Sequence, residues 1–197
     1  MKKNIGLLLI IVIMLMGCAT EENKVDFAYA PVVCEYTTSP TCWTVVDCIS
    51  TNVKVYANNT VEVYCGDFYD SLGPGEGLSI EYIYGETFKI TEEQKQGIID
   101  VLEKNKRALF SEEKENDVCD GDSSYIILFD ENGEKVHLFE GAGKYGKNFR
   151  HIKEKMDSVL PEKTLENVRD KATEILVDYL LENYPERYDW LAEERGR

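Results

Sequence analysis

VKVYANNTVEVYC, residues 53–65, is the stretch that decides the fold. Its apolar residues alternate on either side of the loop at 57–59, a pattern typical of a β-hairpin. A two-residue Asn-Asn loop would place Val55 opposite Glu62 and divide the apolar residues between two faces. A three-residue loop places the valines of both strands on one face, so the sequence predicts that register.

The segments after this hairpin continue the pattern of a sheet that is covered by helices. Residues 79–90 are typical of a strand with a break at Gly85. Thr91 then forms a capping box with Gln94, three residues later, which marks the start of a helix. The apolar spacing that follows predicts a helix over residues 92–106.

A second hairpin is predicted around the Asn-Gly pair at residues 132–133, which favours a two-residue type I′ turn. This turn would place Phe129 opposite Val136 and Ile127 opposite Leu138. Both faces of the hairpin are apolar in that register. We therefore expect it to lie in the centre of the sheet.

Helices follow the second hairpin. Apolar residues at helical spacing predict one helix over residues 148–160, and Pro161 stands where the next helix would begin. Pro185 ends that second helix and leaves residues 188–194 for a short final one. The order βββ-α-ββ-α-α predicts an α+β fold, a mainly antiparallel sheet of about five strands packed by helices.

The N-terminus is typical of an export signal. Lys2 and Lys3 precede an uncharged apolar run that is shorter than the roughly 20 residues of a transmembrane helix. The run ends in LMGC, residues 15–18, which resembles the lipobox of bacterial lipoproteins. The resemblance implies cleavage before Cys18, a diacylglyceryl group on its sulfur, further acylation such as palmitate, and anchorage at the extracytoplasmic face of the cell membrane. The alternative is an uncleaved signal anchor.

The predicted organisation has four parts. They are a signal peptide over residues 1–17, the lipidated Cys18 with a tether over residues 18–33, a single α+β domain over residues 34–184, and a short C-terminal helix or tail over residues 185–197. A domain of this length is large enough to bury an ordinary hydrophobic core.

Short motifs along the domain occur in a familiar order. They are a Cys-containing lead-in (SPTC, residues 39–42, with Cys48), the hairpin arms VKVY and VEVYCG, and the helix start ITEE at residues 90–93. This order resembles a domain of unknown function found in secreted bacterial proteins, with Asn59 in place of the usual hairpin glycine. The resemblance covers residues 40–160 and implies an exported α+β domain without any catalytic residue to transfer.

The charge balance restricts the partners. The chain has 37 acidic and 22 basic residues and a formal net charge of −15. Binding to nucleic acid requires a basic face, so we expect no nucleic-acid partner. Peripheral binding to anionic lipid is disfavoured for the same reason. Solubility accounts for the acidity, with a calcium-collecting surface as the alternative.

The glycine-rich stretch GAGKYGKN, residues 141–148, has the spacing of two nucleotide-binding patterns. It follows the second arm of an antiparallel hairpin, and Asn148 lacks the hydroxyl group that a phosphate loop offers to magnesium. The context therefore excludes a nucleotide site. Backbone amides at the helix start, next to basic side chains, remain a candidate anion site. Its residues are Gly143, Lys144, Gly146 and Lys147.

Carboxylates around Gly121 form a weak candidate calcium site, because they lack the spacing of an EF-hand. They are Asp117, Asp120 and Asp122, and the alternative is a polar turn. Five cysteines remain when Cys18 is lipidated, and an exported protein can form disulfides. The candidate pairs are Cys65 with Cys119 and Cys42 with Cys48, and all five thiols stay reduced if the source is anaerobic.

The combined observations favour a non-catalytic binding or interaction domain on a membrane-anchored lipoprotein. Its expected partner, besides the membrane that holds the lipid, is another envelope protein. One alternative is an envelope hydrolase that uses a cysteine or a carboxylate pair. The other is a calcium-dependent binding module that uses the three aspartates. No cofactor is expected.

Overall fold

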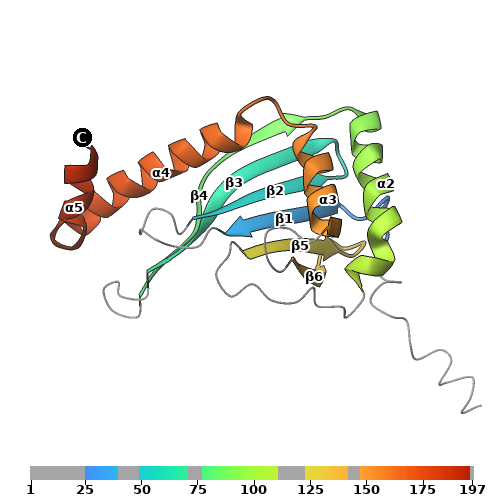
Figure 1. Ribbon diagram of the computed structural model, residues 1–197, viewed down its shortest axis with the longest axis horizontal. Helices are drawn as coiled ribbons and strands as arrows, with labels where there is room; N and C mark the ends of the chain where they lie inside the picture. The colour runs from blue at the N-terminus through green and yellow to red at the C-terminus, as the bar shows by residue number, and fades with distance from the viewer. Residues whose placement is uncertain (1–24, 40–48, 71–76, 111–122, 142–146, 196–197) are drawn as a thin grey trace, which may run out of the picture.

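The computed structural model describes residues 25–39, 49–70, 77–110, 123–141 and 147–195 (Figure 1). They form a six-stranded antiparallel sheet in the order β4-β3-β2-β1-β5-β6, with helices beside it. The α+β prediction is confirmed, and a strand is added to it. The strands are β1 (Val32–Ser39), β2 (Ser50–Tyr56), β3 (Thr60–Asp70), β4 (Leu78–Lys89), β5 (Ser123–Phe129) and β6 (Lys135–Gly141). The helices are α2 (Glu92–Leu109), α3 (Lys147–Asp157), α4 (Thr164–Asn183) and α5 (Pro185–Arg195).

The hairpin of β2 and β3 has the predicted register. Val55 pairs with Val61 and Val53 pairs with Val63, and all of these side chains are fully buried. The loop closes through Asn59, whose φ of 62° is left-handed. Asparagine tolerates this conformation better than most residues other than glycine, which accounts for its use here.

β1 is the strand that the sequence analysis did not predict, and it lies near the middle of the sheet between β2 and β5. The tether expected over residues 18–33 is also wrong from residue 25 onward, because Val25 and Phe27 belong to the hydrophobic core. Val32 to Thr38 are mostly β-branched or aromatic, which suits a strand. The strand is completed by pairing with β5, a partner remote in sequence that local patterns do not reveal.

The turn between β5 and β6 differs from the predicted type I′ turn. The carboxylate of Asp130 accepts hydrogen bonds from the amides of Asn132 and Glu134, and the amide of Gly133 donates to the Asp130 carbonyl oxygen. Gly133 has a φ of 83°. These bonds favour a three-residue loop, and the register shifts so that Phe129 pairs with Lys135 instead of Val136.

The position of this hairpin also needs correction. Ile127 pairs with Leu138 as predicted. However, β6 forms one edge of the sheet, and Leu138 is exposed. In the described sheet, β5 has a neighbouring strand on each side and β6 has one neighbour. Apolar residues on both faces of the hairpin therefore did not place both of its strands in the centre.

The predicted helices form, with different ends. Thr91 and Gln94 make both hydrogen bonds of the capping box before α2. α4 begins at Thr164 and not at Pro161, because Lys163 adopts a left-handed φ of 63° that ends the preceding turn. Pro185 separates α4 from a final helix, as predicted, but it is itself the first residue of α5.

The two faces of the sheet have different environments. Cys34 contacts Met156 of α3 at 3.6 Å, and Glu86 of β4 binds Lys171 of α4, so these strand residues define the helix face. Alternate residues of a strand point to opposite sides. Glu35 pairs with Lys54, so both lie on the other side. We call it the open face, a name that refers only to the described residues.

Across the part of the chain that the structure describes, no helix is both long and apolar enough to cross a bilayer.

Candidate functional site

Most of the residues singled out by sequence lie outside the described residues. They are Cys18, Cys42, Cys48, Asp117, Cys119, Asp120, Asp122, Gly143, Lys144 and Gly146. The lipidation, calcium and anion sites that use them stay predictions. Lys147 is described, and it is the exposed first residue of α3.

Cys65 is a free and fully buried thiol among the described residues. Its candidate partner Cys119 lies outside them, so that disulfide stays a prediction. The Cys65 sulfur lies 3.6 Å from the hydroxyl oxygen of Thr51. Burial raises the pKa of Cys65, and burial followed by the charge of Glu35 raises the pKa of Cys34. Both thiols stay protonated near neutral pH, which makes them poor nucleophiles.

One arrangement of side chains recurs in the described residues. In each case a tyrosine hydroxyl donates to a carboxylate that also binds a lysine or an arginine. We name each triad by the element that supplies its cation. They are the α3 triad (Tyr36, Asp157, Lys153), the α4 triad (Tyr84, Glu86, Lys171), the α5 triad (Tyr188, Asp70, Arg187) and the sheet triad (Tyr64, Glu35, Lys54).

The α3 triad joins α3 to the centre of the sheet. Tyr36 of β1 is buried, and its hydroxyl donates to Asp157 at the end of α3. Lys153, one helical turn earlier, binds the same carboxylate, and its Nζ lies 5.1 Å from the centre of the Tyr36 ring. The ring thus contacts a cation that the carboxylate neutralises.

The α4 triad joins α4 to the edge strand β4. Lys171 Nζ lies 2.9 Å from Glu86 Oε1, and the Tyr84 hydroxyl donates to the same oxygen at 2.8 Å. The hydrogen bond from Lys171 lowers the pKa of Glu86 and raises that of Lys171. The pair is partly solvated, so it positions α4 more than it stabilises the fold.

The sheet triad consists of strand residues only. Glu35 of β1 is buried and accepts a hydrogen bond of 2.6 Å from the hydroxyl of Tyr64 on β3. Lys54 of β2 lies between these strands, with Nζ 3.5 Å from Glu35 Oε2. A second tyrosine–glutamate hydrogen bond lies next to this triad. The Tyr56 hydroxyl donates to Glu62 at 2.7 Å.

An exposed aromatic pair adjoins the sheet triad. Tyr82 of β4 stacks on Tyr64 with 5.5 Å between the ring centroids, and 52% of Tyr82 is exposed. Gly85 makes this stack feasible, because a Cβ there would lie 2.6 Å from the Tyr82 hydroxyl and 2.7 Å from the Tyr64 Cβ. We call the whole group the open-face platform. It comprises Glu35, Lys54, Tyr56, Glu62, Tyr64 and Tyr82.

Two tyrosines of the platform, Tyr64 and Tyr56, act as hydrogen-bond donors and not as bases. Burial, and next the hydrogen bond to Glu35, raise the pKa of Tyr64. Burial and the bond to Glu62 raise that of Tyr56 in the same way. Both phenols therefore stay protonated near neutral pH, and their bonds hold the rings in one orientation.

A second candidate site lies where α4 meets α5. The amide of Tyr184 still donates to the carbonyl oxygen of Leu180 at 2.8 Å, but Tyr184 has non-helical φ and ψ of −138° and 50°. Pro185 has no amide hydrogen and a φ that suits the first position of a helix. The chain therefore bends here and α5 begins in a new direction. We call this bend the elbow.

The α5 triad holds the elbow against the sheet. Arg187 donates to Asp70 Oδ2 at the end of β3, from Nη2 at 2.8 Å and from Nε at 3.1 Å. The hydroxyl of the buried Tyr188 donates to the same oxygen. The Arg187 guanidinium also lies 5.5 Å from the centre of the Tyr188 ring.

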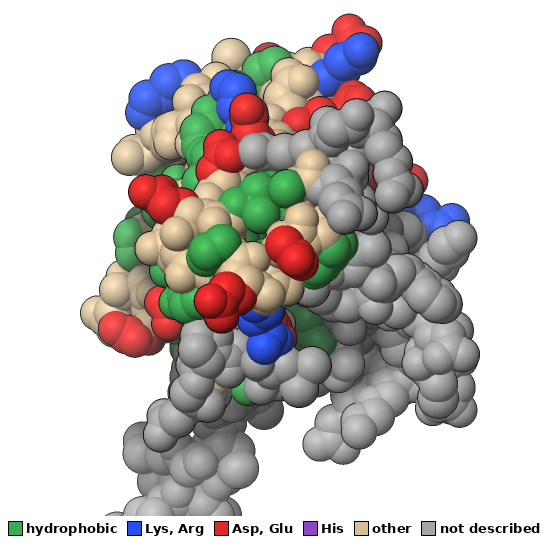
Figure 2. Space-filling model, turned by 90° about the vertical axis from the view of Figure 1, so that its left-hand side faces the viewer, with side chains coloured by type: hydrophobic (Ala, Val, Ile, Leu, Met, Phe, Trp, Pro, Cys, Tyr) green, Lys and Arg blue, Asp and Glu red, His purple; other side chains and the backbone are tan. Residues whose placement is uncertain are grey.

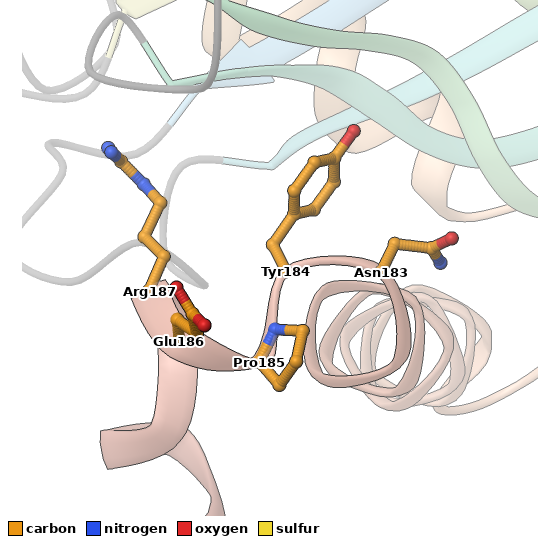
Figure 3. A pocket seen from close by; sticks show the side chains of 5 residues that line it. All are labelled: Asn183, Tyr184, Pro185, Glu186 and Arg187. Atoms are coloured by element: carbon orange, nitrogen blue, oxygen red, sulfur yellow. The ribbon is translucent and has the colours of Figure 1, made fainter.

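A cavity of about 400 Å³ opens at the elbow. Figure 3 shows the side chains of Tyr184 and Arg187 extending the same way, with Pro185 and Glu186 at the bend between them. Asn183 lies at the end of α4, next to Tyr184. This elbow pocket is lined by Asn183, Tyr184, Pro185, Glu186 and Arg187.

The sequence analysis missed both sites, although part of their signal was present. In the opening hairpin, the residues between the valines are lysine, glutamate and tyrosine, and the chosen register places them together on one face. Glu35 was missed because no strand was predicted over residues 32–39. Pro185 was recognised as a helix breaker, yet Asp70, the residue that holds the elbow, is distant in sequence.

Over the described ranges, no group of three or more His, Cys, Asp or Glu side chains is arranged to hold a metal ion. The three aspartates of the candidate calcium site lie outside those ranges.

No protein-family model, no curated protein and no solved structure matches this chain. The resemblance noted for residues 40–160 therefore gains no support from these comparisons.

Proposed function

We propose that this chain is a lipid-anchored, extracytoplasmic binding protein and that its open-face platform binds another protein of the cell envelope. One observation carries the proposal. The sheet triad consists of strand residues only, and an exposed stacked tyrosine adjoins it. The other triads each connect a helix to the sheet, which explains them as structural joints.

The platform has the properties of a preorganised contact surface. The hydroxyls of Tyr64 and Tyr56 are each bonded to a carboxylate, and Tyr82 rests against the ring of Tyr64. Large side chains that are already fixed lose little conformational entropy on binding. Tyrosine is also enriched at the centres of protein interfaces, where it combines apolar area with a polar group.

The chemistry of the described groups supports binding rather than catalysis. The pKa values of Tyr56 and Tyr64 are raised, so both phenols are protonated near neutral pH and are not available as bases. The thiols of Cys34 and Cys65 are buried and protonated. A hydrolase would require an accessible nucleophile or a base, and neither thiol serves.

The anchor and the platform require separate tests. Cys18→Ser is expected to abolish incorporation of labelled palmitate and to move the protein from the membrane fraction to the soluble fraction. Retention of both label and membrane association in Cys18→Ser would contradict the lipoprotein assignment.

The platform is tested by cross-linking and pull-down from intact envelopes, because the partner is then captured in place. Tyr82→Ala is expected to lose the captured partner. Tyr29→Ala is the matched control, since Tyr29 is 79% exposed and is not part of the platform. Equal capture by the wild type and by a normally folded Tyr82→Ala variant would exclude the platform as the contact surface.

A further inference from the structure

We propose that the elbow pocket binds a basic side chain, lysine or arginine, of a protein partner. The proposal concerns a different part of the molecule from the open-face platform and does not depend on its function. It follows from the charges, the acceptors and the size of the pocket.

Arg187, the one cation among the residues that line the pocket, is already paired with a carboxylate. Arg187 donates two hydrogen bonds to Asp70, which neutralise its charge and make it a poor receptor for an added anion. Glu186 also lines the pocket, and it has no ion pair within the part of the chain that is described. An incoming group therefore meets one uncompensated carboxylate, which favours a cation.

The neutral groups of the pocket also suit a cation. The Nδ2 of Asn183 donates to the carbonyl oxygen of Tyr179 at 2.8 Å, so its Oδ1 is the atom left to accept from a ligand. The ring of Tyr184 offers a π face to an ammonium or guanidinium group. Edge contacts at 6.2 Å with Tyr179 and 6.4 Å with Tyr188 hold that ring in place.

The pocket is large enough and rigid enough to admit a side chain. Its volume of about 400 Å³ is at the lower end of the range for small-ligand sites. Pro185 fixes the bend, and the α5 triad fixes α5, so the walls in Figure 3 are held from both sides. A single lysine or arginine side chain can enter without rearrangement of the helices.

The surroundings favour approach of a basic partner. Figure 2 shows the side of the molecule to which α5 projects, where Asp and Glu side chains lie among hydrophobic ones and beside several Lys and Arg side chains. The formal net charge of the chain is −15. A surface of this kind attracts cations over several ångströms and repels acidic partners.

The test uses the full-length chain, labelled with ¹⁵N, in a non-ionic detergent. It is titrated with blocked tripeptides Ac-Gly-X-Gly-amide in which X is lysine, arginine or norleucine, and the amide signals of Asn183, Glu186 and Arg187 are followed. We expect saturable shifts with lysine, with arginine or with both. The uncharged norleucine peptide should cause none.

Variants separate a pocket from general electrostatic attraction. Glu186→Gln should weaken binding about fivefold or more, since it removes the uncompensated charge. Glu162→Gln removes an exposed carboxylate between α3 and α4 and should change binding less than about twofold. Tyr184→Leu should weaken binding about threefold because the π face is lost.

The outcomes distinguish this proposal from the platform. Equal shifts with norleucine, shifts that do not saturate, or equal losses in Glu186→Gln and Glu162→Gln would each overturn it. Tyr82→Ala should bind the peptides normally. Failure of the envelope pull-down would therefore leave the pocket untouched, and failure of the peptide titration would leave the platform untouched.

Discussion

The triads that join helices to the sheet and the sheet triad use the same three kinds of side chain, but they differ in burial. The carboxylate side chain of Glu35 is 7% exposed, followed by Asp70 at 11%, Asp157 at 28% and Glu86 at 32%. The most buried carboxylate thus belongs to the triad that joins no helix. Burying a carboxylate is costly unless it is well paired, so a structural joint alone does not explain Glu35. The sheet triad instead orients Tyr64 and Lys54 on the open face, which is the surface that we propose as the binding surface.

The largest effect is expected at the elbow, where one carboxylate serves two partners. Asp70→Ala removes the acceptor of Arg187 and of the buried Tyr188 hydroxyl, and it should lower the free energy of unfolding by about 2–4 kcal/mol. Urea unfolding measures the loss, and faster hydrogen exchange in α5 should accompany it. Asp70→Asn, which keeps an acceptor oxygen, should be intermediate. A loss below about 0.5 kcal/mol would show that the triad does not hold α5.

An intermediate effect is expected when the same hydroxyl is removed from each kind of triad. Tyr64→Phe leaves the buried Glu35 with Lys54 alone at 3.5 Å and should cost about 1–2 kcal/mol. Tyr36→Phe leaves the more accessible Asp157 with Lys153 and with water, so about 0.5–1 kcal/mol is expected. Urea unfolding of both variants shows which one loses more unfolding free energy. The reverse order would refute the ranking by carboxylate burial.

The smallest effect is expected in alkaline solution. The pKa of Tyr64 is raised above its ordinary value of 10.0, so its contribution to stability is complete below pH 10 and is lost as pH rises further. Tyr64→Phe removes this contribution and should flatten the decline of the unfolding free energy between pH 9 and pH 11. Urea unfolding at several pH values tests the slope. Identical slopes in the wild type and the variant would show that the Tyr64 phenol is not protected in the fold.

The sequence specified the local features of this fold well. The register of the β2–β3 hairpin followed from the positions of its valines, and the start of α2 followed from Thr91 and Gln94. In both cases the interacting residues are close in the chain, so spacing alone determines the geometry. The turn before β6 failed because the side chain of Asp130, which the Asn-Gly rule ignores, selects the loop length.

The candidate sites could not be derived in the same way. Tyr36 and Asp157 are 121 residues apart in the chain, and Asp70 and Tyr188 are 118 residues apart. Their pairing depends on where the sheet and the helices finally pack. Sequence showed that the chain is rich in tyrosines and acids, but only the strand order showed which ones meet.

The position of β1 has a consequence for the order of folding. β1 is the first of the described strands, yet it lies inside the sheet, and Glu35 pairs with Ile127 on its β5 side. When the chain is synthesised from its N-terminus, β1 is therefore paired on both sides only after β5 has been made. Such long-range pairing slows folding, because the ends of a long loop must meet first. A chain truncated before residue 123 would keep one side of β1 unpaired, exposed to pairing with another molecule.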